Sequence, residues 1–214
     1  MSQGAGSEIV LVHGLWFGSF FMRPLARRVE KHTGLPVRRI NYRSTKGELD
    51  EHARRLYEFC RQESAGTRHR VGHSLGGLVI LKMLSMYPEF EPGRLVFLGS
   101  PLQGSRVARK AIELPGVSAL LGQVQADLER GFDGFAGGRE AGMIAGSRSL
   151  GLGLFVGGLD GPGDGTVALE ETRAEWLCAH CVLPVTHTGM LYSPEVAEKA
   201  AQFLETGRFG PPDA

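Results

Sequence analysis

The sequence predicts an α/β fold in which a mostly parallel sheet of about six strands is flanked by helices. Short apolar runs of strand length alternate with segments whose apolar residues recur at helical spacing. Such alternation is typical of a parallel sheet covered by helices on both faces. The chain has 214 residues, of which 42% are hydrophobic and 22% charged. This length and composition indicate a single domain over residues 1–214, large enough to bury a core.

The N-terminal half shows the alternation clearly. In chain order its predicted elements are strand 8–12, helix 19–31, strand 36–42, helix 47–64, strand 68–71, helix 77–84 and strand 94–99. The first helix is expected to begin properly at Pro24, a residue favoured at the first helical position. The second helix depends on the helical spacing of Leu49, Ala53 and Leu56. The third ends before Pro88, which cannot continue a helix.

The C-terminal half is harder to interpret. Residues 101–150 lie between two predicted core strands and have room for a small helical lid or flap, with short helices at 106–113 and 118–130. Thirteen glycines between residues 131 and 165 suit tight loops near a site but equally a flexible connection. The remaining predicted elements are a strand over 152–159 around Val156, a strand over 179–185, a helix over 196–204 ended by Gly207, and a frayed tail at 208–214.

One short motif indicates the chemistry. Gly72-His73-Ser74-Leu75-Gly76 matches G-x-S-x-G, a strand-to-helix turn that exposes a strained serine. The turn forces the serine toward positive φ and brings the flanking chain very close, so glycines two residues before and after it avoid a collision. A strand is predicted before the motif and a helix after it, which is the context that the motif requires. Ser74 is therefore the predicted nucleophile.

A serine nucleophile needs a neutral imidazole to accept its proton. Two histidines follow Ser74 in the chain. His187 lies in the turn-like stretch between the last predicted strand and a helix start at Ser193 and Pro194, which is where a catalytic base is expected. His180 lies within or at the start of that strand, so we interpret it as a core or edge histidine.

A carboxylate must orient the imidazole, and two aspartates compete for that role. Asp164 stands in Gly163-Asp164-Gly165-Thr166-Val167, just past a predicted strand end, and Asp160 lies four residues earlier. Either could simply be a turn aspartate, because Asp-Gly is a strong turn signal. Asp164 is favoured because its loop turns and then re-enters packed structure.

The loop after the first strand completes the predicted site. Acyl transfer needs two preorganised donors for the oxyanion. One is the backbone N–H of Leu75, after the nucleophile, and the other comes from His13-Gly14-Leu15-Trp16, where Leu15 is favoured and Trp16 is the alternative. His13 is expected to make local hydrogen bonds. Trp16, Phe17 and His73 are the predicted substrate-binding residues, and the nearby aromatic residues favour an apolar acyl group although each alone also fits core packing.

Together these motifs resemble the α/β-hydrolase superfamily and, within it, the small bacterial lipases and esterases. The resemblance extends from Val10-Leu11-Val12-His13-Gly14 through Gly72-His73-Ser74-Leu75-Gly76-Gly77 to His187-Thr188-Gly189-Met190-Leu191. It implies an α/β-hydrolase fold and a Ser74, Asp164, His187 triad that cleaves carboxylic esters through an acyl-enzyme without a cofactor. Acyl transfer or thioester hydrolysis by the same triad is the alternative. A non-catalytic binding protein on the same scaffold is disfavoured, because the triad is complete and both glycines of the strand-to-helix turn, called the nucleophile elbow, are present.

Composition excludes several other classes of function. The net charge of +1 and the interspersed charges give no electrostatic basis for binding nucleic acid. No signal peptide or apolar segment of membrane-spanning length is recognised, so a cytoplasmic enzyme without stable membrane insertion is expected. Three cysteines, an odd number, fit a reducing compartment, and Cys178-x-x-Cys181 around His180 is a weak metal signal, so no metal is expected. The natural ester and the oligomeric state stay open.

Overall fold

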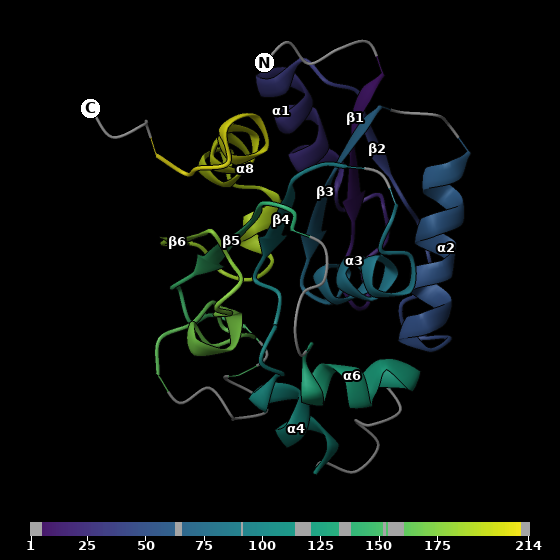
Figure 1. The fold of residues 1–214 in the computed structure, drawn as a ribbon. Helices are drawn as coiled ribbons and strands as arrows, with labels where there is room; N and C mark the ends of the chain where they lie inside the picture. Colours follow the sequence, from purple (N-terminus) through teal and green to yellow (C-terminus); the bar gives the residue numbers. More distant parts are fainter. Residues whose placement is uncertain are drawn as a thin grey trace.

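A parallel sheet of six strands lies at the centre of the computed structural model, which describes residues 6–62, 66–90, 92–113, 121–132, 138–151, 153 and 161–210 (Figure 1). The strands are β1 (Ser7–Val12), β2 (Val37–Arg39), β3 (Thr67–His73), β4 (Leu95–Leu98), β5 (Ala141–Gly146) and β6 (Ala179–Leu183). Their order is β2-β1-β3-β4-β5-β6, and every neighbouring pair is parallel. The carboxyl ends of all six strands therefore meet at one edge of the sheet, where α/β proteins form their sites.

Helices cover both faces of this sheet. α1 (Arg23–Thr33) and α8 (Pro194–Thr206) pack together on one face, and α2 (Leu49–Arg61) and α3 (Leu75–Met86) on the other (Figure 1). Alternate residues of β1 enter the two cores: Ile9 and Leu11 join the α1 and α8 side, whereas Val10 and Val12 join the α2 and α3 side. This follows from the period of two along a strand. The expected architecture, a mostly parallel sheet of about six strands flanked by helices, is confirmed.

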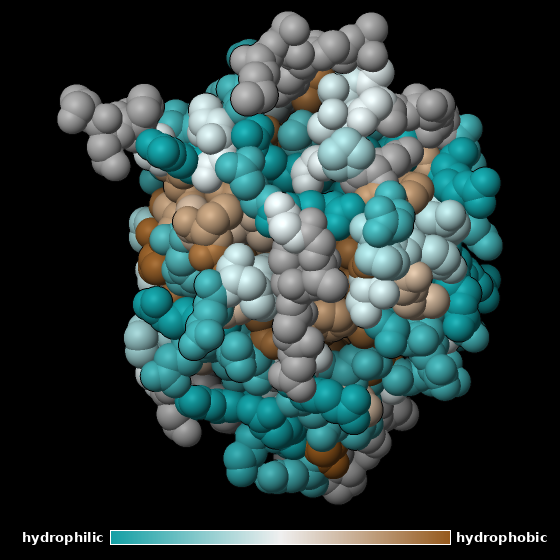
Figure 2. All heavy atoms as spheres, in the orientation of Figure 1, coloured by the Kyte–Doolittle hydropathy of each residue, from teal (hydrophilic) through white to brown (hydrophobic). Residues whose placement is uncertain are grey.

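Short helices lie beyond the carboxyl edge of the sheet. They are α4 (Arg106–Ile112), the 3-10 turn Gly122–Val124 and α6 (Gln125–Arg130), and they are seen beyond one end of the strands in Figure 1. The backbone N–H of Gly47, in the loop after β2, donates to Gln123 Oε1 at 2.6 Å. These helices therefore cover loops at the same edge as the elbow serine. The face of the molecule in Figure 2 is mostly hydrophilic, with smaller apolar areas between the polar side chains.

β5 corrects the expected course of the C-terminal half. It comes from residues 141–146, inside the 101–150 segment expected to form a lid, whereas the strand expected over 152–159 lies largely outside the described residues. The sequence Ala-Gly-Met-Ile-Ala-Gly has too few bulky residues to be recognised as a strand. The small residues are needed because a Cβ on Gly142 would lie 2.6 Å from the Phe203 ring of α8.

Two element ends also differ from expectation. α1 begins at Arg23, one residue before the Pro24 at which the helix was expected to begin properly, and residues 19–22 before it form turns instead of helix. The tail expected to fray from residue 208 is held at Phe209, whose ring lies 4.8 Å from that of Phe203. Lys199 Nζ also donates to the Phe209 carbonyl at 2.7 Å. Residues 211–214 lie outside the described part of the chain.

Candidate active site

Ser74 connects β3 to α3 in a backbone conformation that non-glycine residues rarely adopt. Its φ and ψ are 54° and −124°, and in the described part of the chain the one other non-glycine residue with positive φ is Trp16, at 61°. A backbone of this kind costs about 1–3 kcal/mol and persists only where its surroundings hold it. The Ser74 N–H donates to the Leu98 carbonyl at the end of β4, at 2.9 Å. Ser74 is thus held at the carboxyl edge of the sheet and stays partly exposed.

Glycines make the turn possible. A Cβ on Gly72 would lie 2.6 Å from the Gly77 nitrogen, and one on Gly76 would lie 2.2 Å from the Val12 carbonyl oxygen. Both distances are far below any real Cβ contact, so α3 can start this close to β1 only because these residues lack side chains. Gly14 has the same role from the opposite side, because its Cβ would lie 2.9 Å from Ser74 Cβ.

We predict that Gly76→Ala destabilises the fold by about 1–3 kcal/mol or more, because the added methyl group must push α3 away from β1. Urea denaturation of the two proteins measures the difference. Gly66→Ala is the matched control, since nothing lies within 4 Å of a Cβ there and its φ is not in the left-handed region. Equal unfolding free energies for Gly76→Ala and Gly66→Ala would contradict the prediction.

His187 and Asp164 form a buried pair. His187 Nδ1 lies 2.7 Å from Asp164 Oδ2, and the side chains are 8% and 1% exposed. The second carboxylate oxygen, Oδ1, accepts the backbone N–H groups of Thr166 at 2.9 Å and Val167 at 2.7 Å. The backbone N–H of His187 also donates to the backbone carbonyl of Asp164 at 2.8 Å. Both oxygens of the carboxylate are therefore engaged, and its orientation toward the imidazole is set by the backbone.

Another glycine brings this pair close to the end of β4, where the backbone of Ser74 is hydrogen-bonded. Gly99, directly after β4, has φ +56°, and a Cβ there would lie 2.8 Å from Asp164 Oδ2 and 3.2 Å from His187 Nδ1. The preceding residue is Leu98, whose carbonyl accepts the Ser74 N–H. Gly99 thus lets the pair approach the carboxyl end of β4. No motif in the sequence marks Gly99, whose one local signal is that it directly follows a buried strand.

His73 packs against His187 of this pair. Its side chain is fully buried, its Nε2 lies 3.0 Å from the His187 carbonyl oxygen, and the two rings are 4.7 Å apart. Burial lowers the pKa of His73 to about 3, so its imidazole is neutral at ordinary pH. In this state Nε2–H donates to the His187 carbonyl. The placement differs from the substrate contact expected for His73, because no part of its side chain reaches the surface.

His13 supports the loop that follows β1. Its Nδ1–H donates to the Gly14 carbonyl at 2.9 Å, and its Nε2 accepts the Tyr42 N–H at 3.3 Å. The Tyr42 hydroxyl donates to the His13 carbonyl at 2.6 Å, and the two rings stack at 4.2 Å. Burial lowers the pKa of His13, which favours the neutral tautomer that these contacts require. His13 makes the local contacts expected of it.

The next residues of the loop bear on the choice between the two candidate oxyanion donors. The backbone N–H of Trp16 donates to Ser44 Oγ at 3.0 Å, and the residue is 47% exposed. Its backbone amide is therefore already used for holding the loop in its left-handed turn. This leaves Leu15, which is buried at the start of the turn, as the better candidate of the two. On the other side, Leu75 begins α3, and the first N–H groups of a helix have no partner within it.

The other residues weighed from the sequence lie elsewhere. His180 is on β6, at the edge of the sheet, where Nε2 lies 2.9 Å from Thr172 Oγ1. Cys178 donates its thiol hydrogen to the Ala141 carbonyl at 3.1 Å. In the described ranges, no group of three or more His, Cys, Asp or Glu side chains is arranged to hold a metal ion. Asp160 lies outside those ranges.

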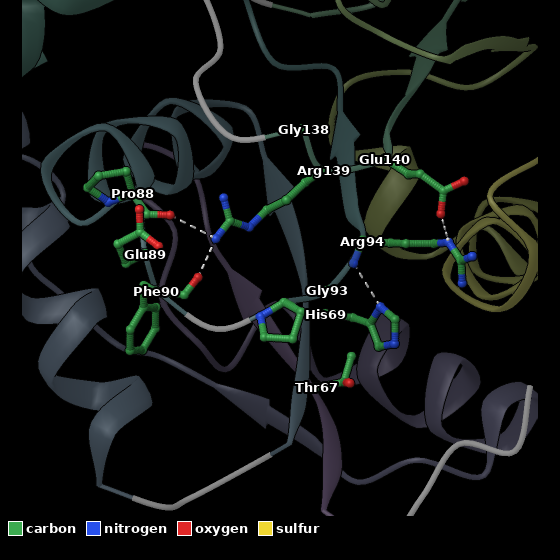
Figure 3. Close-up of a pocket in the computed structure, with 11 residues that line it drawn as sticks. Thr67, His69, Pro88, Glu89, Phe90, Gly93, Arg94, Gly138, Arg139 and Glu140 are labelled. Atoms are coloured by element: carbon green, nitrogen blue, oxygen red, sulfur yellow. Dashed lines mark hydrogen bonds and ion pairs between the residues drawn. The ribbon is translucent and has the colours of Figure 1, made fainter.

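A cavity of about 620 Å³ opens at the opposite, amino edge of the sheet, and Figure 3 shows it. Thr67 and His69 of β3 line it together with Arg94, Arg139 and Glu140. His69 Nδ1 accepts a hydrogen bond from the backbone N–H of Arg94 at 3.0 Å (Figure 3). Since Ser74 follows the carboxyl end of the same strand, this cavity does not belong to the candidate site.

His69 nevertheless predicts how stability depends on pH. Burial, followed by the nearby Arg94 and Arg70, lowers the pKa of His69 to about 4. Below the unfolded value of about 6.5 the unfolded chain binds the extra proton and the native protein does not, so stability falls as the pH drops from 6.5 to 4. We predict that His69→Gln reduces this pH dependence, by up to about 1.4 kcal/mol per pH unit. Urea unfolding at pH 7, 6 and 5 measures it, and an unchanged slope would contradict the assignment.

Comparison with known proteins identifies the family. The model of the alpha/beta hydrolase family matches residues 9–208, so the chain belongs to this family. No curated protein matches the chain in sequence. Among solved structures, the Bacillus licheniformis lipase BlEst2 superimposes with a TM-score of 0.73 at 20% identity, over 95% of this chain and 92% of the lipase.

Two further solved structures share the fold. A metagenomic carboxyl esterase gives a TM-score of 0.69 at 17% identity, over 94% of this chain and 76% of the esterase. Phospholipase PlaB from Legionella pneumophila gives 0.72 at 15% identity, over 94% of this chain and 56% of the phospholipase. Along the described residues, no helix combines the length and apolar character needed to cross a membrane.

Proposed function

We propose that this protein is a serine hydrolase that cleaves carboxylic esters of small molecules or lipids through Ser74, His187 and Asp164. The observation that carries the proposal is the His187–Asp164 pair, held at 2.7 Å at the same sheet edge as a serine whose φ is 54°. A strained serine and a carboxylate-oriented imidazole serve nucleophilic catalysis. The family and the esterase and lipase folds of the structural relatives support the reaction class.

The contacts of Asp164 define what each group does. Because Asp164 Oδ2 takes the Nδ1–H of His187, the Nε2 of the neutral ring carries the lone pair and accepts the Ser74 proton. Ser74 Oγ then attacks the ester carbonyl, and the alkoxide leaves with the proton that His187 returns to it. Water attacks the acyl-enzyme in the same way and releases the acid. No cofactor takes part in these steps.

Two backbone amides stabilise the oxyanion in this scheme. Leu75 donates from the first turn of α3 and Leu15 from the loop after β1, each contributing about 3–4 kcal/mol by analogy with measured cases. His73 is a positioning residue, because it holds the backbone carbonyl of His187 from below. Trp16 and Phe17 remain our candidates for substrate contact, since Trp16 is exposed beside Leu15 and the Phe17 ring meets the His73 ring edge-on at 5.7 Å.

Two measurements test the proposal. A fluorophosphonate probe should label the native protein on Ser74, as peptide mass spectrometry would show, and absence of labelling would favour a non-catalytic binding protein. A panel of p-nitrophenyl esters and acyl-CoA thioesters then separates ester hydrolysis from the alternative, thioester hydrolysis or acyl transfer. Turnover of the thioesters alone would favour that alternative, which uses the same residues.

We predict that hydrolysis of p-nitrophenyl acetate is insensitive to EDTA. The scheme has no metal, because Ser74 supplies the nucleophile and His187, oriented by Asp164, supplies the base. Circular dichroism with and without the chelator separates loss of activity from loss of fold. Loss of activity on chelation, followed by recovery with zinc, would contradict the serine mechanism.

A further inference from the structure

Aromatic and arginine side chains, all exposed except the half-buried Arg28, gather beside the candidate active site. Phe20, Phe21 and Tyr192 are 66%, 41% and 46% exposed, and they line a hollow of about 510 Å³ together with Arg23, Arg27 and Arg28. We call these six residues the aromatic–arginine surface. Among the described residues that line the hollow, none is acidic. Large exposed aromatic residues in one patch usually mark an interaction site.

This surface is connected to the site by packed rings. Phe21 meets Phe17 edge-on at 5.3 Å, Phe17 meets His73 at 5.7 Å, and His73 lies 4.7 Å from His187. Tyr192 directly follows the 3-10 turn Gly189–Leu191, which begins two residues after His187. A partner bound at this surface would therefore lie close to the proposed reaction centre.

Arg23 is not placed where helix stability would put an arginine. Arg23 is the first residue of α1, whose first turn contains no acidic residue and whose N-cap Met22 provides no side-chain cap. The positive end of a helix dipole disfavours cations, so stability alone would select Asp or Glu at this end. Arg27 follows one turn later on the same face of the helix, and the Arg23 guanidinium lies over the Phe20 ring at 5.4 Å. This concentrates positive charge around apolar rings.

We propose that the aromatic–arginine surface binds peripherally to an anionic lipid surface. Aromatic rings of this kind enter the headgroup region, and each basic residue near an anionic leaflet adds about 1 kcal/mol, which corresponds to about fivefold in affinity. The mixture of rings and arginines matches a surface that is anionic outside and apolar beneath. The proposed lipid binding does not depend on the proposed ester hydrolysis. The consequence that bound lipid would be presented to the site as a substrate does rest on the proposed function.

The experiment measures sedimentation with sucrose-loaded vesicles of phosphatidylcholine, with and without the anionic lipid phosphatidylglycerol. Ser74→Ala is the background protein, so that no turnover alters the lipid. We expect stronger binding to the anionic vesicles. Arg27→Gln combined with Arg28→Gln should weaken it about tenfold to thirtyfold. The matched control, Arg54→Gln with Arg55→Gln, removes the same charge from exposed positions of α2 on the other face of the sheet and should bind normally.

Further arms separate this proposal from its rivals. Phe20→Ser should lower the binding that survives at 0.5 M salt, where charges are screened to a Debye length of a few ångströms. Equal binding to both vesicle types, or an equal loss in the α2 control, would overturn the proposal. So would binding of monomeric dodecyl phosphate without any vesicle binding, which would indicate a subsite for a soluble amphiphile. Hydrolysis of soluble p-nitrophenyl acetate by the Arg27→Gln, Arg28→Gln protein with Ser74 intact tests the proposed function separately, and we expect it to be unchanged.

Discussion

Replacing Ser74 with alanine is expected to lower kcat for p-nitrophenyl ester hydrolysis by roughly three to six orders of magnitude. The change removes the one atom that forms the acyl-enzyme, and nothing else at the carboxyl edge of the sheet takes its place in the proposed scheme. Steady-state kinetics together with loss of fluorophosphonate labelling measures the effect. KM should change little, because the oxyanion donors and the substrate contacts remain.

The fold should survive this substitution. Alanine at residue 74 keeps the hydrogen bond from the backbone N–H to the Leu98 carbonyl. Its backbone has the same positive φ as that of serine and is strained to the same extent. Ser85→Ala, at an exposed position of the same helix α3, is the matched control and should retain full activity. If Ser74→Ala keeps more than a few per cent of native activity while Ser85→Ala behaves as native, the nucleophile has been wrongly assigned.

Asp164→Asn is expected to lower kcat by about four orders of magnitude, as removal of the carboxylate does in serine proteases. Asp164 Oδ1 accepts two backbone N–H groups, from Thr166 and Val167, so the amide oxygen of asparagine must stay on that side. Its NH₂ group then faces His187 Nδ1 and donates to it. This moves the imidazole proton to Nε2, where it blocks acceptance of the Ser74 proton.

Kinetics at pH 8 together with unfolding curves test this account. Asp164→Asn should be folded and nearly inactive, while Asp160→Asn, the competing aspartate in the sequence, should be mildly affected. The reverse ranking would transfer the role to Asp160. An Asp164→Asn protein that keeps more than a tenth of native activity would show that the orientation of His187 does not depend on this carboxylate.

Local patterns in the sequence determined much of the fold. The alternation of strand-length and helix-length segments predicted a parallel sheet with helices on both faces, because apolar periodicity reflects which side chains each element must bury. The G-x-S-x-G turn predicted positive φ at Ser74, and the structure has it. This signal was strong because the serine and the two glycines that the turn requires lie within five consecutive residues. The order Ser74, Asp164, His187 selected candidates for the same site, but it could not bring them together.

Contacts between distant segments decided the rest. β5 was not recognised because its glycine and alanine residues make room for Phe203, which lies far along the chain. His73, which its place in the motif predicts as a substrate contact, is buried against the carbonyl of His187. The Trp16 amide is engaged by Ser44, and Gly99 admits the His187–Asp164 pair to the end of β4. The sequence by itself thus determined which residues have the required chemistry, and the tertiary structure decided which groups meet, because the hydrogen bonds and close approaches that orient the site join segments with no local signal in common.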